Sequence, residues 1–364
     1  MTALDLSALS IVDHHCHLIA RTLVPVLSAF TEATDRQAVQ LSAGSLLARR
    51  AVREIAALYG CDPTVEAVEA ERKRLGPDEV ARRCLGAADI ALAFVDDGLG
   101  GDELLTLDEL SDILPIRRVV RVEALAERLA SDGIGWGDFR ERILTELANP
   151  GDIVAFKTIV AYRSGLEIGP LDERSAAAAY SRLSRAAPRI AEKPLCDWLV
   201  HRTFEAAAHR GLPVQIHSGY GDPDLDLRLA NPLHLRRLLE EPRYRSAPLV
   251  LLHAAYPFVR EAGYLAWVYP QVHLDLGLPV PLLSAAGMRR TVSAAFELTP
   301  LQKLLFSTDA YQAPERFVCA ALWGRHLIGE ALGEAAADDE LTVADAEAAA
   351  EAILASNARR IYRV

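Results

Sequence analysis

The sequence lacks the features that mark several classes of protein. It has only five cysteines among 364 residues, widely spaced and without a CxxC pair. An odd, scattered set of this kind excludes a disulfide scaffold and is typical of reduced thiols, so we expect a cytoplasmic protein. No stretch approaches the roughly eighteen consecutive apolar residues of a membrane helix, and residues 1–10 lack a basic segment followed by an apolar one. The sequence therefore predicts neither a membrane span nor a secretory signal.

Positively charged residues are also in the minority. Lysine and arginine number 39 against 50 aspartates and glutamates, which gives a formal net charge of -11 at pH 7. The resulting field repels polyphosphates, which argues against nucleic acid and favours a small molecule as the partner. Hydrophobic residues make up 51% of the chain, enough to bury a large core. The composition predicts a globular protein and is compatible with a homo-oligomer.

Eight short apolar runs, separated by segments of helical periodicity, are the expected strands. They are Ser10–His17, Asp89–Val95, Arg117–Glu123, Val154–Ala161, Pro213–Ser218, Leu249–Ala254, Val272–Asp275 and Leu304–Asp309. Most are apolar almost throughout, which is typical of strands covered on both faces of a parallel sheet. Eight of them predict an α/β fold, a (β/α)8 TIM barrel, in preference to an open doubly wound sheet.

A long helical segment interrupts this pattern. Between the first two expected strands, residues of about 19–88 show helical periodicity, most clearly in Leu46–Tyr59, Pro63–Leu75 and Pro77–Leu85. Ordinary connections are far shorter, so we expect a helical insertion within one barrel domain that spans residues 1–364. The insertion either roofs a pocket at the C-terminal rim of the barrel or is a decoration unrelated to chemistry.

The strongest chemical signal is the HxH segment Asp13-His14-His15-Cys16-His17, at the end of the first expected strand. Side chains alternate along a strand, so His15 and His17 should project together above Asp13, while His14 and Cys16 point to the other side. Two adjacent imidazoles form half of a metal site. Paired histidines also occur as hydrogen-bonded core groups, and the pair alone does not separate the two interpretations.

Four further ionisable residues also follow apolar runs. Lys157 lies near the end of the fourth expected strand, and His217, His253 and Asp309 end the fifth, sixth and eighth. The C-terminal ends of parallel barrel strands converge on one face, where active sites of this architecture are built. Each residue taken singly could be a strand end that meets solvent. Agreement among the five positions favours one polar site.

The residue types at these positions suit a divalent metal. Neutral imidazoles and a carboxylate bind Zn, Mn, Fe or Ni, and zinc is our first expectation. A metal site with an open position lowers the pKa of bound water from roughly 15.7 to about 7, which supplies a nucleophile near neutral pH. A carboxylate beside that water can accept its proton, so Asp309 is a candidate both for a ligand and for a general acid–base group.

The combination of HxH on the first strand with Lys157, His217, His253 and Asp309 resembles the amidohydrolase superfamily of metal-dependent hydrolases. The resemblance is closest to the amidohydrolase-2 branch, and within it to domains sometimes fused to a glutamine-synthetase-like domain, which we do not expect in these 364 residues. It rests on the flanking segments Phe156–Leu166, His217–Asp222 and Asn357–Tyr362.

The resemblance implies two versions of the metal site. In the binuclear version Lys157 is carboxylated and bridges two ions, of which the HxH pair and Asp309 hold one, and His217 and His253 hold the other. In the mononuclear version the HxH pair, His217 and Asp309 hold one ion, while His253 acts on the substrate or on water. We favour the binuclear form because every position of the full set is filled. An unmodified Lys157 would instead be a cation close to the metal.

The loops after the fourth and fifth strands offer candidates for substrate binding. Tyr162 and Arg163 follow Lys157, and Tyr220 and Asp222 follow His217, so both pairs should face the mouth of the barrel. Arg163 could bind a substrate carboxylate through two hydrogen bonds, or pair with a nearby aspartate and only shape the loop.

We therefore expect an enzyme, a metal-dependent amidohydrolase that cleaves a C–N bond of a small polar substrate. Water activated by the metal would attack the carbonyl, and Asp309 would carry the proton to the departing nitrogen, with His253 also catalytic. The alternative that the resemblance implies is a non-oxidative decarboxylase with one metal ion and an unmodified Lys157. A metal-binding relative without catalysis is a third possibility.

Overall fold

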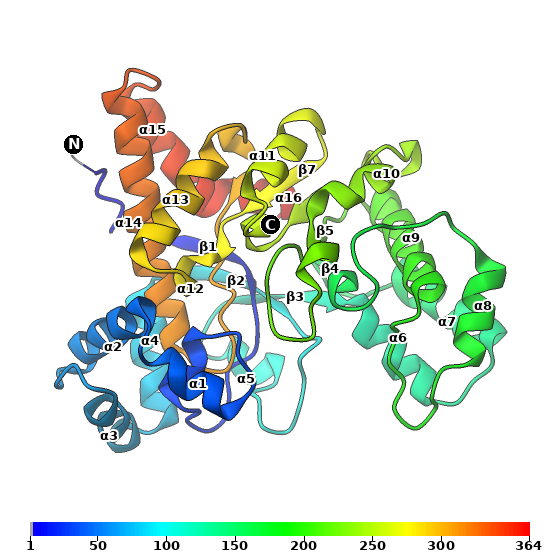
Figure 1. The fold of residues 1–364 in the computed structure, drawn as a ribbon, viewed down its shortest axis with the longest axis horizontal. Coiled ribbons are helices and arrows are strands. Elements are labelled where there is room, and N and C mark those ends of the chain that lie inside the picture. The colour runs from blue at the N-terminus through cyan, green and yellow to red at the C-terminus, as the bar shows by residue number, and fades with distance from the viewer. Residues whose placement is uncertain (1–2) are drawn as a thin grey trace.

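The computed structural model describes residues 3–364, and its centre is a barrel of parallel strands (Figure 1). Eight strands follow one another in the order β1-β2-β3-β4-β5-β6-β7-β9, and each neighbouring pair is parallel. They are β1 (Ile11–Cys16), β2 (Ile90–Asp96), β3 (Ile116–Arg121), β4 (Ala155–Thr158), β5 (Val214–Ile216), β6 (Leu249–Leu251), β7 (Val272–Asp275) and β9 (Leu304–Leu305), with a short β8 (Gly277–Leu278) outside this order. The predicted (β/α)8 barrel is confirmed.

Hydrogen bonds outside the strand ladder join the last strand to the first. The backbone N–H of Asp309 donates to the carbonyl of His15 at 3.0 Å, and that of His17 donates to Ala310 at 2.8 Å. Asp13 adds a side-chain link, because its Oδ1 accepts from the Thr308 backbone N–H at 2.9 Å. These contacts bring the ends of β1 and β9 together and so place the HxH segment beside Asp309.

Several strands are shorter than their apolar runs predicted. The fourth run, Val154–Ala161, is extended only over β4, because Val160–Tyr162 forms a 3₁₀ turn. The sixth run ends at Leu251, since the residues of His253–Ala255 all have positive φ, which a strand cannot accommodate. The rest of each run enters the buried turns at the mouth of the barrel, where the polar residues predicted for the site lie.

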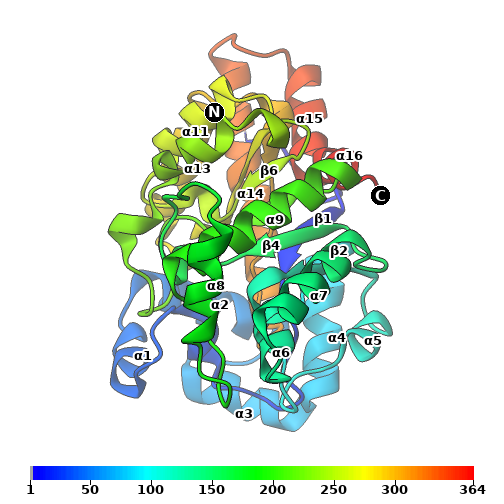
Figure 2. The same cartoon turned by 90° about the vertical axis from the view of Figure 1, so that its right-hand side faces the viewer.

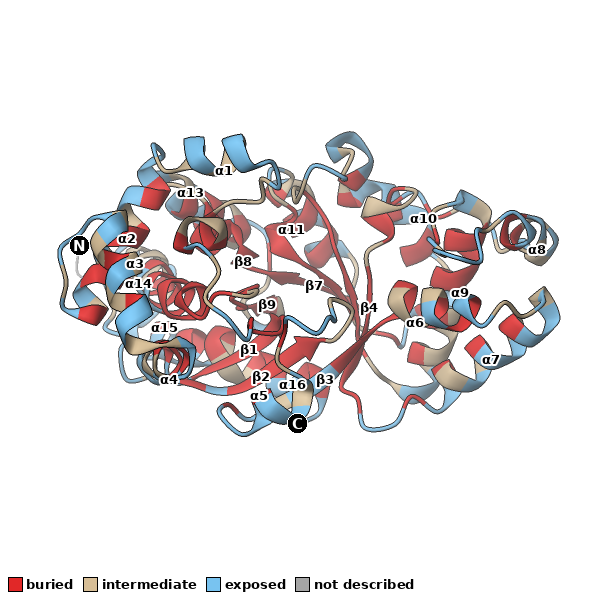
Figure 3. Cartoon of the chain, turned by 90° about the horizontal axis from the view of Figure 1, so that it is seen from below, coloured by how far each residue is buried: buried red, intermediate tan, exposed pale blue. Residues whose placement is uncertain are grey.

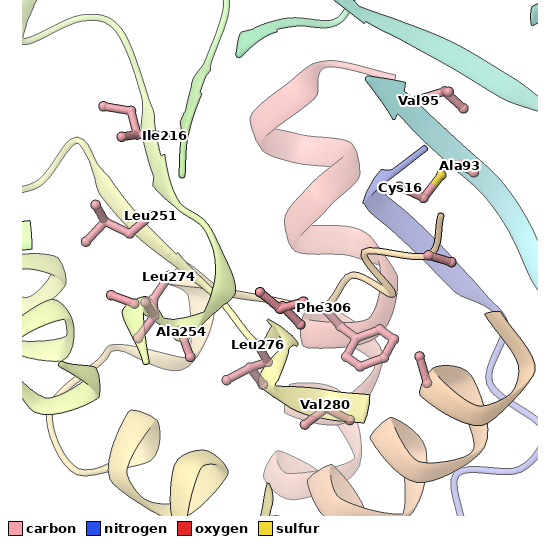
Figure 4. Close-up of a cluster of buried hydrophobic side chains, with 14 of the residues drawn as sticks. Cys16, Ala93, Val95, Ile216, Leu251, Ala254, Leu274, Leu276, Val280 and Phe306 are labelled. Carbon is pink, nitrogen blue, oxygen red and sulfur yellow. The ribbon is translucent and has the colours of Figure 1, made fainter. Parts of the chain in front are cut away.

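The first strand departs from regular alternation. Its register with β2 shifts within the HxH segment, where β1 carries one residue more than its partner. His14 therefore faces the barrel interior, with Nδ1 3.1 Å from Tyr362 Oη, whereas Cys16 belongs to the hydrophobic cluster of Figure 4. The prediction that these two residues share a face is wrong. His15 and His17 do lie side by side, with ring centroids 4.9 Å apart.

Helices surround the barrel, and their outer faces carry most of the exposed surface, while the strands are buried over most of their residues (Figure 3). They are α1 (Arg36–Ser42), α2 (Leu46–Tyr59), α3 (Val65–Leu75), α4 (Pro77–Ala88), α5 (Leu107–Ser111), α6 (Val122–Ser131), α7 (Trp136–Ala148), α8 (Glu173–Ser181), α9 (Lys193–Arg210), α10 (Arg236–Leu239), α11 (Val259–Val268), α12 (Pro279–Leu282), α13 (Ala285–Phe296), α14 (Glu315–Ala337), α15 (Val343–Glu351) and α16 (Asn357–Tyr362). None of the helices within residues 3–364 combines the length and the apolarity needed to cross a bilayer.

The expected helical insertion is present as α1–α4, on the side of the barrel away from α6–α9 (Figures 1 and 2). It is fastened to α14 by a buried carboxylate, Glu315. Glu315 Oε1 accepts from Arg72 Nε at 2.6 Å and from the Tyr59 hydroxyl at 2.7 Å. Arg72 is fully buried and also donates to Glu69 at 2.7 Å. This network links the insertion to the first turn of α14, directly after the loop that carries Asp309.

Tyr362 of α16 fills the barrel below the mouth. Its ring lies 4.7 Å from that of Phe94, and its hydroxyl accepts from Gln215 Nε2 at 2.9 Å. Asp275 of β7 accepts from His14 Nε2 at 3.0 Å and from the backbone of His253 at 2.8 Å. Packed and hydrogen-bonded side chains thus occupy this part of the barrel interior.

Candidate metal centre

A cavity of about 510 Å³ lies at the C-terminal ends of the strands. It is lined by five of the six predicted metal-site residues: His17, Lys157, His217, His253 and Asp309. The sixth, His15, is buried behind them, with Nε2 2.9 Å from Lys157 Nζ. The loop that contains Glu32 also lines the cavity, so the insertion contributes a wall of the pocket and is not a remote decoration.

Three residues have the geometry of a metal site. Asp309 Oδ1 lies 3.3 Å from His15 Nε2 and 3.4 Å from His17 Nε2, and candidate ligand atoms of the three residues all fall within 4.8 Å of one another. Two imidazole nitrogens and a carboxylate oxygen are the ligands that Zn²⁺ and similar divalent ions prefer. The described donor set therefore fits a divalent metal.

The histidines are held in the form that can bind a metal. Burial and, secondarily, the neighbouring Lys157 cation lower the pKa of His15 to about 3. The same two causes lower the pKa of His217 to about 3, and burial lowers that of His253 well below its usual range. All three imidazoles are neutral near pH 7, so a metal need not displace protons from them.

Asp309 is ionised although it is buried. Burial by itself would raise the pKa of Asp309, but His253, the two HxH histidines and Arg316 hold it well below its usual range. His253 and Asp309 both have left-handed backbones, with φ of 65° and 47°. Such conformations cost energy in a non-glycine residue and concentrate at functional sites. Here the hydrogen bonds of their N–H groups to Asp275 and to the His15 carbonyl retain them.

Asp96, at the end of β2, is a residue of this centre that the sequence analysis missed. Its Oδ2 lies 2.6 Å from Arg121 Nη2, 3.0 Å from Lys157 Nζ and 3.8 Å from His17 Nδ1. Burial opposes ionisation of Asp96, but Arg121 and Lys157 hold its pKa well below the usual range. Like the predicted residues, Asp96 directly follows an apolar run. The expected second strand stopped one residue short of it at Val95.

Arg316, in the first turn of α14, was also missed. Its Nη2 donates to Asp309 Oδ2 at 3.0 Å, and its Nη1 lies 3.5 Å from Glu32 Oε1. The two oxygens of Asp309 are therefore divided, with Oδ1 toward the HxH pair and Oδ2 toward Arg316. Arg316 comes seven positions after Asp309 and a helix begins between them, so no short motif could have identified this contact.

His217 and His253 form the facing wall. Their ring centroids are 4.5 Å apart, and that of His253 is 5.8 Å from that of His15. His217 Nε2 lies 3.2 Å from the carbonyl oxygen of Tyr220, and the Tyr162 ring packs against the imidazole at 4.4 Å. The structure thus gathers all six residues at one mouth, in a close trio, an adjacent lysine and a flanking pair.

Of the four predicted substrate-binding residues, three line the cavity and one does not. Tyr162, Arg163 and Asp222 line the cavity, and the Tyr162 hydroxyl accepts from the Asp222 backbone at 3.3 Å. Arg163 pairs with Glu127 at 3.2 Å, not with an aspartate of the following loop. Tyr220 packs edge-on against another tyrosine, and its buried hydroxyl has no hydrogen-bond partner among residues 3–364.

Comparisons with known proteins agree with this geometry. The family model described as Amidohydrolase (Amidohydro_2) matches residues 117–364. Protein fluG of Emericella nidulans is 30% identical over 400 aligned residues, which cover 97% of this chain but 46% of that protein, so the chain spans about half of its relative.

Among solved structures, a protein from Lactobacillus casei assigned as a metal-dependent hydrolase superposes with a TM-score of 0.88 and 26% identity, over 100% of this chain and 98% of the other. A uronate isomerase from Bacillus halodurans, with a TM-score of 0.68 and 14% identity over 98% and 94% of the two chains, shares the fold. The family model, which covers more than half of the chain, shows that the chain belongs to the amidohydrolase family.

Proposed function

We propose that this enzyme hydrolyses a C–N bond of the amide type in a small polar substrate. The observation that carries the proposal is the trio of His15, His17 and Asp309, whose ligand atoms lie within 4.8 Å of one another beside a cavity of about 510 Å³. A divalent ion at this site, zinc as the first candidate, would activate water and polarise the substrate carbonyl. His217, His253 and Lys157 complete the proposed site.

The protein residues have separate tasks in this proposal. The Asp309 carboxylate accepts a proton from the attacking water and passes it to the departing nitrogen. His253 lines the cavity, and its Nδ1 has no hydrogen-bond partner among residues 3–364. This imidazole is therefore free to bind a second ion or to hold the substrate. Tyr162, Arg163 and Asp222 line the outer cavity and are proposed to contact the rest of the substrate.

Lys157 decides between the binuclear and mononuclear forms. A bridging carbamate requires carboxylation of its Nζ, the atom that lies 2.9 Å from His15 Nε2 and 3.0 Å from Asp96 Oδ2. In the binuclear form, purified enzyme contains two ions per chain and a carbon dioxide adduct on Lys157, and Lys157→Ala has a lower metal content. One ion per chain, no adduct and unchanged stoichiometry in the variant would contradict the bridge.

The experiment that tests the function is a substrate panel with metal-replete enzyme. N-acyl and γ-glutamyl compounds are assayed for amine release, and aromatic acids are assayed for carbon dioxide release. Hydrolysis of an amide that is lost on chelation and restored by metal supports the proposal. Carbon dioxide release without amide hydrolysis would replace it with the decarboxylase.

A further inference from the structure

We propose that Arg121, at the end of β3, binds a carboxylate group of the substrate, so that the natural substrate is an anionic amide. This inference rests on the proposed function for the amide and on the geometry of Arg121 for the carboxylate. Arg121 lies in the same cavity as the metal centre, and its side chain is 7% exposed.

Arg121 is fixed on one side and free on the other. Its Nε and Nη2 both donate to Asp96, at distances of 2.6 to 3.2 Å. Its Nη1 makes no hydrogen bond to any atom of residues 3–364, although the side chain lines the cavity. Gly98 packs closely against the Arg121 side chain, since a Cβ there would lie 2.3 to 2.4 Å from its Cβ, Cδ and Nε atoms. An arginine oriented in advance by a buried carboxylate loses little entropy when it binds an anion.

The location of Arg121 suits a group attached close to the scissile bond. A single oxygen, Asp96 Oδ2, contacts Arg121 Nη2 at 2.6 Å and Lys157 Nζ at 3.0 Å, and lies 3.8 Å from His17 Nδ1. The Asp96 carboxylate thus lies between the Arg121 guanidinium and two of the proposed metal ligands, Lys157 and His17. A short amide bound at the trio of His15, His17 and Asp309 brings a nearby carboxylate within reach of Arg121.

The other arginines of the cavity are less suited to this role. Arg189 is 54% exposed and pairs with Asp224 at 3.1 Å. Arg316 is committed to Asp309 and Glu32. Arg163 binds Glu127, which also accepts from the Ile190 backbone at 2.9 Å and is thereby fixed in the wall. In both Arg163 and Arg316 the Nε atom has no hydrogen-bond partner in residues 3–364, but it is buried and therefore not accessible to a substrate in the cavity.

The charge balance favours an anion over a cation. Five cationic side chains and four carboxylates line the cavity, and Asp96, which contacts Arg121 and Lys157, brings the number of carboxylates to five. A bound divalent ion leaves an excess of positive charge, which a substrate carboxylate offsets. Carboxylation of Lys157 together with a second ion leaves the excess unchanged. An amine in the same place would meet net repulsion.

The relative affinity for a matched pair of amides tests the inference, with binding as the readout. Metal-loaded enzyme is titrated calorimetrically with N-acetylglycine and with N-acetylglycinamide, which has the same skeleton without the negative charge. We expect the wild type to prefer the acid. Loss of a charge-assisted hydrogen bond weakens binding by about 10- to 100-fold, so in Arg121→Gln the preference for the acid over the neutral amide should fall by this factor.

Two further variants keep the test decisive. Arg118→Gln is the matched control, because Arg118 lies on the same strand and pairs with the next carboxylate, Asp97, at 2.5 Å on the exposed surface. It should keep the preference. Gly98→Ala displaces the Arg121 side chain while retaining its charge, and should weaken acid binding even if Arg121→Gln does not fold.

The possible failures are distinguishable. Equal affinity of wild type for both amides, or loss of the preference in Arg163→Gln but not in Arg121→Gln, would overturn the assignment of Arg121. Hydrolysis of neutral amides alongside that result would leave the proposed function standing. A preference that depends on Arg121, in an enzyme that hydrolyses no amide, would support the carboxylate site and reject the proposed function.

Discussion

Arg316 offers the sharpest test of how the centre is held together. Its Nη2 fixes Asp309 Oδ2 at 3.0 Å, and both side chains are nearly buried, with exposed fractions of 5% and 11%. If this contact aims Oδ1 at His15 and His17, removing it should weaken metal binding even though Arg316 itself is no ligand. Arg316→Gln keeps a polar side chain of similar length but loses the charge.

The expected size of the effect follows from the geometry. At 3.0 Å the attraction between two unit charges is about 5.5 kcal/mol for an effective dielectric constant of about 20. The desolvation of both groups offsets much of this attraction. The net contribution of the Arg316–Asp309 contact is therefore about 1.5 to 3 kcal/mol, the range for a hydrogen bond between charged groups. This corresponds to about 10- to 100-fold in affinity, the usual loss when a partner of a metal ligand is removed.

The assay is competition for metal between the enzyme and a chromophoric chelator at pH 7. Arg289→Gln is a suitable control, because Arg289 makes an exposed pair with Glu330 on α14. We expect the control to bind metal as the wild type does and Arg316→Gln to bind it more weakly, with kcat reduced at saturating metal. Wild-type metal affinity in Arg316→Gln would refute the argument that this arginine positions Asp309.

Three other outcomes can be measured. Asp309→Asn should keep at least part of the metal but lose about 10²- to 10⁴-fold in turnover, and near-wild-type activity would exclude its role in proton transfer. Burial and, secondarily, Lys303 lower the pKa of His273 to about 4. Between pH 6.5 and 4 the His273 imidazole is therefore protonated in the unfolded chain but neutral in the folded protein. The free energy of unfolding consequently decreases as the pH falls from 6.5 to 4. His273→Leu should reduce the dependence of urea unfolding on pH in that window by up to about 1.4 kcal/mol per pH unit, and an unchanged slope would contradict it. Arg72→Met leaves the buried Glu315 without its cation, so it should destabilise the protein by about 3 to 5 kcal/mol and expose the insertion to proteolysis; resistance equal to that of wild type would show that the ion pair does not hold the insertion.

The sequence was sufficient for the general architecture and for placing ionisable residues at the mouth of the barrel. Buried parallel strands require apolar runs, and a polar residue directly after such a run reaches the mouth of the barrel, which is why His217, His253 and Asp309 could be identified singly. The helical insertion was equally visible from its periodicity. Strand ends were less well predicted, because the apolar residues of the mouth turns look like a continuation of the strand.

Contacts between distant segments were decided only by the tertiary structure. Asp96 accepts from Arg121 on the neighbouring strand, and Arg316 reaches Asp309 from a helix that the insertion holds in place through Glu315. Such pairings depend on how the barrel closes and how the helices pack on it, and local sequence periodicity contains no information about either. The amino-acid order by itself determined which groups with metal-binding chemistry stand at strand ends. The fold decided which of them meet, which charges are neutralised, and which guanidinium remains free for a ligand, because these depend on distances between segments that the chain separates widely.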